Sequence, residues 1–134
     1  MRRILAATPL LLLAILAAAP ADAAQEGATG RWTISGRVAG FAFTLACDFQ
    51  QAGQILSGVC ADTATSDPKV KAGRRHVLSR GHVDGDQVSW TYPSSFLFSR
   101  FDVDYVGART GDRMSGQITV QGRTGTFTAE RAAP

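Results

Sequence analysis

The chain has 134 residues, of which 45% are hydrophobic and 19% charged, and its formal net charge is +3 at pH 7. This length predicts one domain with a core large enough to need no stabilising metal. The basic residues are dispersed, and the densest group (residues 69–75) lacks the interleaved aromatic residues of a nucleic-acid-binding stripe. Composition and charge therefore argue against nucleic acid as a partner.

The first 23 residues have the features of a cleaved signal peptide. Two arginines precede an apolar stretch (residues 4–19), and Ala21 and Ala23 stand at small-residue cleavage positions. The apolar stretch is short and rich in alanine, and no basic stop-transfer cluster follows, which disfavours a transmembrane anchor. We therefore expect a periplasmic or secreted protein whose single mature domain covers residues 24–134, without a membrane span.

Beyond residue 24, apolar and polar residues alternate and glycine-containing turns follow at short intervals, as in the run from Phe41 to Gln50. The eight expected strands are 31–38, 41–50, 56–61, 75–83, 88–92, 100–106, 114–120 and 125–131. Short turns such as Asp84-Gly85 leave only nearest-neighbour pairing available. The pattern thus predicts an all-β fold, an eight-stranded antiparallel up-and-down β-barrel. The main alternative is a two-sheet sandwich, although the short Cys47 to Cys60 spacing does not fit an immunoglobulin-like one.

Two segments interrupt the alternation. Asp62 to Gly73 is a polar stretch with Pro68, too long for a tight hairpin. Pro93 to Ser99 contains the apolar group Phe96-Leu97-Phe98, and Pro93 predicts a crossing loop here and not a paired strand. Such a contiguous apolar group indicates either a lid over the barrel mouth or a plug beneath it.

The two cysteines, Cys47 and Cys60, form an even pair in a chain expected to be exported, which predicts a disulfide. A metal site would need more ligands, and His76 and His82 stand at no recognised zinc spacing from the cysteines. A free reactive thiol is disfavoured in an oxidising compartment. We predict neither a metal nor a cofactor.

The run Gly30-Arg31-Trp32 at the first strand, together with Arg131 in the last, resembles the calycin superfamily of lipocalins, avidins and their bacterial relatives. The resemblance implies that Trp32 plugs one barrel end and that Arg131 packs across it. The chain is shorter than typical lipocalins, lacks their C-terminal helix, and does not match the biotin-binding residues of avidins. It is also similar to periplasmic inhibitors of secreted bacterial metalloproteases, which share Gly-x-Trp, but their N-terminal segment is not recognisable in residues 24–29.

Alternation places an apolar, aromatic-rich set of side chains inside the barrel, as a packed core or as the walls of a cavity. The leading hypothesis is binding of a small apolar molecule at the barrel mouth, and the alternative is a protein-binding barrel such as a metalloprotease inhibitor. The candidate ligand-binding residues are Phe43, Trp90, Tyr92, Phe96, Phe98 and Tyr105.

Nothing in the sequence groups an acid, a base and a nucleophile. His76 and His82 fall on one side of an expected strand, whereas Asp102 and Asp104 face outward opposite Phe101. We name no catalytic residue, and a cofactor-free isomerase or cyclase is the least favoured hypothesis.

Overall fold

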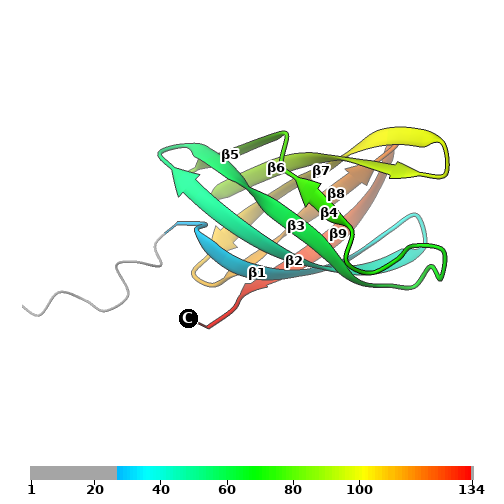
Figure 1. The fold of residues 1–134 in the computed structure, drawn as a ribbon. Coiled ribbons are helices and arrows are strands. Elements are labelled where there is room, and N and C mark those ends of the chain that lie inside the picture. The colour runs from blue at the N-terminus through cyan, green and yellow to red at the C-terminus, as the bar shows by residue number, and fades with distance from the viewer. Residues whose placement is uncertain (1–26, 134) are drawn as a thin grey trace, which may run out of the picture.

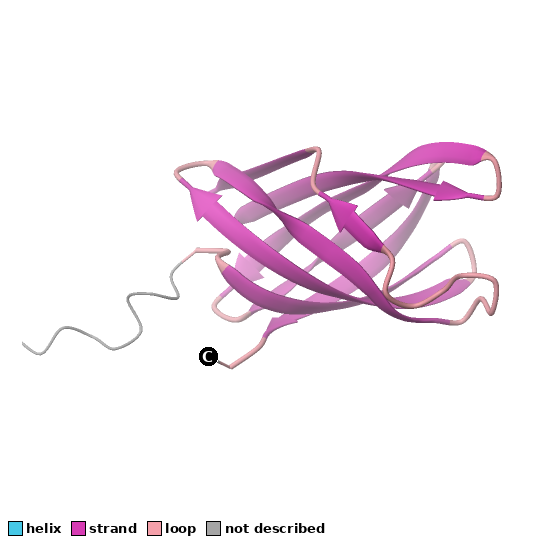
Figure 2. Ribbon diagram, viewed as in Figure 1, coloured by secondary structure: helices cyan, strands magenta, loops and turns pink. Residues whose placement is uncertain are grey.

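The computed structural model describes residues 27–133, so the expected signal peptide lies outside the described residues. Within this part of the chain there are nine β-strands and no helix (Figures 1 and 2). Accordingly, no helix in this range could cross a membrane. The strands are β1 (Gly30–Val38), β2 (Phe41–Ala52), β3 (Ile55–Thr65), β4 (Arg75–Val77), β5 (Arg80–Asp84), β6 (Gln87–Phe96), β7 (Ser99–Thr110), β8 (Arg113–Val120) and β9 (Arg123–Arg131).

All neighbouring strands are antiparallel, and the β1–β9 and β2–β3 pairings close the sheet on itself. Strands β4 and β5 together occupy one position in the wall, because β4 pairs with β3 while β5 pairs mainly with β6. The described residues therefore form a closed antiparallel barrel of eight strand positions, which confirms the predicted all-β fold. It is consistent with a calycin-like fold.

The single strand expected over residues 75–83 is wrong, because this segment divides between β4 and β5. The backbone N–H of Leu78 donates to the carbonyl of Gly58 on β3 (3.0 Å), whereas the next N–H, of Ser79, donates to the carbonyl of Thr91 on β6 (2.9 Å). The chain changes partner strand between these two residues. Alternation alone does not reveal such a change.

The crossing loop expected at residues 93–99 is also wrong. Strand β6 continues through Pro93 to Phe96 and pairs with β7, and only Leu97 and Phe98 form the turn. Beyond Thr91 the described pairings of β6 are to β7 alone, so Pro93 stands where one side of the strand has no partner. Similarly, the linker expected from Asp62 starts later, because β3 extends to Thr65.

The predicted disulfide is confirmed. Cys47 on β2 and Cys60 on β3 are directly opposite in the strand register and form an S–S bond of 2.03 Å. Both side chains are buried in the barrel core, between neighbours that pair with them from β1 and β4. The bond thus links two adjacent strands in the interior of the barrel.

The described chain enters and leaves the barrel at the same end (Figure 1), and side chains close that end. The Arg131 guanidinium lies 4.6 Å from the centre of the Trp32 ring, and the indole N–H of Trp32 donates to the carbonyl of Ala28 (2.9 Å). A Cβ at Gly30 would lie 3.2 Å from Cδ of Arg131, and φ of Gly30 is 132°. The glycine of the Gly-x-Trp motif is therefore needed both for its backbone conformation and for the passage of the arginine side chain.

Candidate ligand cavity

A cavity of about 520 Å³ opens at the other end of the barrel. Its rim is formed by the β1–β2, β6–β7 and β8–β9 turns and by the loop between β3 and β4, with Ala39, Phe96, Gln121 and Val70 among the lining residues. The walls are mainly apolar and include Phe43, Leu45, Phe101, Val103, Ile118 and Val120. The interior is thus a packed core at the closed end and a cavity at the open end.

The base of the cavity rests on a group of packed aromatic rings. Trp90 stacks on Tyr105 with ring centres 4.7 Å apart. The ring centres of Phe49 and Phe127 lie 5.0 and 5.4 Å from that of the same indole. Phe43 does not fill the space above them, because its ring lies against Gly36 on the neighbouring strand. A Cβ at Gly36 would come within 2.7 Å of that ring. The missing side chain at Gly36 therefore leaves room for the Phe43 ring, which lines the cavity.

Two tyrosine hydroxyls meet at the inner end of the cavity. Tyr92 on β6 and Tyr105 on β7 both line it, and their hydroxyl oxygens are 2.9 Å apart. Burial raises the pKa of both phenols above the ordinary value. Both side chains therefore remain protonated and uncharged at physiological pH.

A hydrogen-bonded couple lies beside the tyrosines. Nε2 of His76, on β4, is 3.0 Å from a carboxylate oxygen of Asp62 on β3, and both residues line the cavity. The imidazole stacks on the Tyr92 ring at 4.6 Å. Sequence reasoning missed this couple, because it assigned Asp62 to a linker and grouped His76 with His82, which is exposed. Among residues 27–133, no group of three His, Cys, Asp or Glu side chains is placed to hold a metal ion.

The candidate ligand-binding residues separate into two groups. Phe43, Tyr92, Phe96 and Tyr105 line the cavity, whereas Trp90 lies beneath its base and Phe98 lies outside it, fully exposed at the β6–β7 turn. Their part in ligand binding stays a prediction. Asp102 is exposed on the outside, and Asp104 accepts a hydrogen bond from the hydroxyl of Thr91 (2.6 Å) on the outer face.

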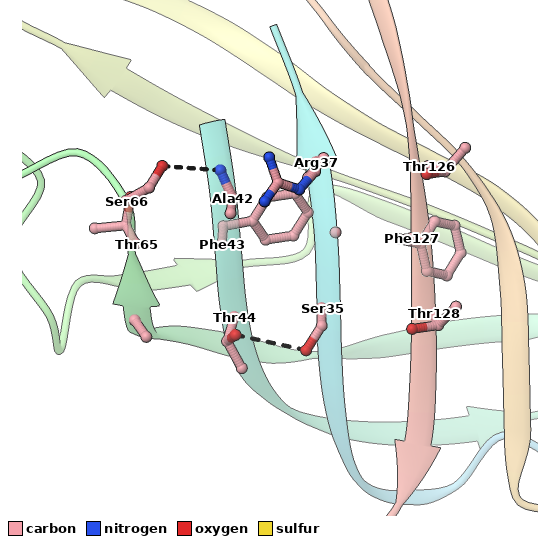
Figure 3. A pocket seen from close by; sticks show the side chains of 12 residues that line it. Ser35, Arg37, Ala42, Phe43, Thr44, Thr65, Ser66, Thr126, Phe127 and Thr128 are labelled. Atoms are coloured by element: carbon pink, nitrogen blue, oxygen red, sulfur yellow. Dashed lines mark hydrogen bonds between the residues drawn. The ribbon is translucent and has the colours of Figure 1, made fainter. Parts of the chain in front are cut away.

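A second hollow of about 470 Å³ lies across β1, β2 and β9 (Figure 3). Hydroxyl groups line it, among them Ser35 and Thr44, whose oxygens are 3.5 Å apart, and Ser66, which accepts a hydrogen bond from the Ala42 N–H (2.9 Å). Phe43 lines both this hollow and the cavity. Its ring therefore separates the cavity from the outer surface at the place where Gly36 has no side chain.

The sequence matches no protein-family model and no curated protein. The likeness to calycins rests on the closed barrel and on the contact between Trp32 and Arg131. The cavity itself is therefore the main indication of function.

Proposed function

We propose that this protein is an exported, lipocalin-like barrel that binds a small apolar molecule in the cavity at its open end. The supporting observation is the cavity of about 520 Å³, whose size and mainly apolar walls suit a small organic ligand. The aromatic rings beneath it and the Trp32–Arg131 contact close the opposite end. A ligand would enter from the turns and displace water from apolar walls, which is the favourable term in such binding.

A pair of valines on β7 allows a matched test. Val103 lines the cavity, whereas Val106, three residues further along the strand, is exposed on the outside. The neutral dye N-phenylnaphthylamine should bind the purified protein with increased fluorescence. Val103→Phe should fill part of the cavity and weaken dye binding about tenfold, while Val106→Phe should leave it unchanged. Absence of dye binding to the wild type, or equal effects of the two variants, would contradict the proposal.

Export is tested by the N-terminus of the protein recovered outside the cytoplasm. Cleavage after Ala23 should make Ala24 the first residue. The Cys47–Cys60 disulfide is compatible with an oxidising compartment. Recovery of the uncleaved chain from the cytoplasm would count against export.

The β6–β7 turn favours a second candidate, a protein-binding barrel such as a metalloprotease inhibitor. Leu97 and Phe98 are 78% and 105% exposed, and two adjacent apolar side chains at a hairpin tip form a contact surface. In this case Leu97→Ser with Phe98→Ser should abolish inhibition of a secreted metalloprotease while dye binding remains. If the unaltered protein does not inhibit such a protease, this candidate fails.

A further inference from the structure

In the hydroxyl pair at the base of the cavity, one of the two O–H groups has no protein acceptor among the described residues. Two neutral phenols carry two hydroxyl protons, and the contact between Tyr92 and Tyr105 uses one of them. Within residues 27–133, neither hydroxyl has a second protein partner at hydrogen-bond distance. The remaining proton therefore needs an acceptor from the contents of the cavity, which both residues line.

The rings that carry these hydroxyls are held in place by their neighbours. Trp90 stacks on Tyr105, His76 stacks on Tyr92, and Asp62 holds His76 through Nε2. An aromatic side chain packed on its face cannot turn its hydroxyl away without disturbing the stack. The donor is therefore fixed in position before a ligand arrives, which lowers the cost of ordering it on binding.

The charges near the pair favour an uncharged acceptor. The Asp62 carboxylate lies beside Tyr92 through its contact with His76, and a ligand carboxylate placed at the hydroxyls would stand close to it. The arginines of the cavity, Arg74 and Arg123, lie toward the rim, and Arg74 already donates to the carbonyl of Ser95 (2.7 Å). The charge of Arg74 reaches Tyr92, but among residues 27–133 no arginine forms a hydrogen bond with either hydroxyl. A carboxylate placed there would therefore be buried beside Asp62 without a cation in contact, which is unfavourable.

We propose that the ligand of this cavity is an apolar molecule with an uncharged carbonyl oxygen, which accepts a hydrogen bond from the Tyr92–Tyr105 pair. This inference rests on the proposed function, because it specifies the chemistry of the same site. Ketones, aldehydes and esters of suitable size belong to this class. A molecule with no acceptor leaves the buried donor unpaired, and the site discriminates against it for that reason.

Three naphthalene dyes of similar shape test the proposal with wild-type protein: prodan, which carries a ketone, dimethylaminonaphthalene, which carries no acceptor, and dimethylaminonaphthoate, which carries a carboxylate. Prodan should bind roughly three- to tenfold more tightly than the dye without an acceptor, the range expected for one neutral hydrogen bond. The carboxylate should bind most weakly. Bound prodan should also emit at longer wavelength in the wild type than in a variant without the two hydroxyls, because its carbonyl receives a hydrogen bond only in the wild type.

The variant Tyr92→Phe with Tyr105→Phe removes both hydroxyls and keeps both rings, a change that leaves no unpaired partner. It should lose the preference for prodan and the emission shift, while binding the dye without an acceptor as well as the wild type does. Ser57→Ala is the matched control, because it removes an exposed hydroxyl on β3 that does not line the cavity and leaves the tyrosines intact. It should preserve the preference.

Unchanged selectivity in the double phenylalanine variant, or tightest binding of the carboxylate to the wild type, would overturn the carbonyl assignment. Binding of the dye without an acceptor with no preference for prodan would overturn it too, while leaving the proposed function in place. If none of the three dyes binds the wild type, the proposed function itself fails. Thermal unfolding of each variant verifies that a lost preference does not come from a lost fold.

Discussion

Arg131 offers the sharpest test of how the closed end is stabilised. Its side chain is 3% exposed, and its guanidinium donates to the carbonyls of Thr29 (2.6 Å), Gly27 (2.9 Å) and Gly111 (3.2 Å). Nε also donates to the carboxylate of Asp112 (2.8 Å). The same group therefore connects the last strand, the segment before β1 and the β7–β8 turn, besides covering the Trp32 ring.

The cost of removing it follows from these contacts. A hydrogen bond from a charged donor contributes about 1.5–3 kcal/mol, and the contact with the indole adds about 1 kcal/mol. The contact with Asp112 counts for less than about 1 kcal/mol because that carboxylate is 66% exposed. Water replaces part of the lost bonding to the carbonyls, so we expect Arg131→Ala to destabilise the protein by about 3 kcal/mol, equivalent to a decrease of about 12 °C in Tm.

Thermal unfolding followed by tryptophan fluorescence measures this effect. Arg113→Ala is the matched control, because Arg113 is 81% exposed and forms a 3.7 Å surface pair with Glu130, and its Tm should change by only a few degrees. The Tm of Arg131→Lys should lie between those of Arg131→Ala and Arg113→Ala, since an ammonium keeps the charge but not the planar set of donors. Equal Tm values for Arg131→Ala and Arg113→Ala would refute the reasoning.

Three further predictions concern the walls and the core. Cys47→Ala with Cys60→Ala removes a bond between residues 13 positions apart and should lower the free energy of unfolding in urea by about 3 kcal/mol. An unchanged midpoint would contradict this. Gly125→Ala should destabilise the protein by about 3 kcal/mol, because its Cβ would stand 1.8 Å from the Arg37 carbonyl oxygen. The control Thr124→Ala, at an exposed neighbouring position, should change stability by less than about 0.5 kcal/mol. Burial raises the pKa of Tyr92 and Tyr105 above 10.0, so the unfolded chain loses these phenol protons at lower pH than the folded one. The contribution of these two phenols to stability should therefore be constant below about pH 10 and decrease as the pH rises beyond it, and Tyr92→Phe with Tyr105→Phe should reduce that decrease.

The parts of the fold that sequence could predict are those that local patterns encode. Alternation from Phe41 to Gln50 has the period of a strand with one buried face, and β2 follows it. The pairing of Cys47 with Cys60 follows because both cysteines lie in one hairpin, where position along the chain decides which residues face each other. The contact between Trp32 and Arg131 came from a family resemblance and not from the pattern.

The remaining features depend on how several strands are arranged relative to one another, which local patterns do not reveal. Pro93 normally argues against a paired strand, and it is accommodated only because β5 has already left that side of β6. The couple of Asp62 and His76 needs the joint register of β3 and β4, which no local signal reveals. Phe43 and Gly36 are opposite each other within one hairpin, yet alternation does not indicate that the Phe43 ring rests on the glycine.

The division of one wall position between β4 and β5 has a mechanical consequence at the open end. There β4 pairs with β3 and the last residues of β6 pair with β7, so the described links across this seam are side-chain contacts, such as Arg74 with the Ser95 carbonyl (2.7 Å) and His76 on the Tyr92 ring. Parting them would widen the entrance without breaking a backbone hydrogen bond of the sheet. The disulfide and the Arg131 contacts hold the rest of the barrel closed meanwhile. If the proposed function holds, a small ligand would enter through a local separation of β4 from β6, while the strand pairing at the closed end stays unchanged.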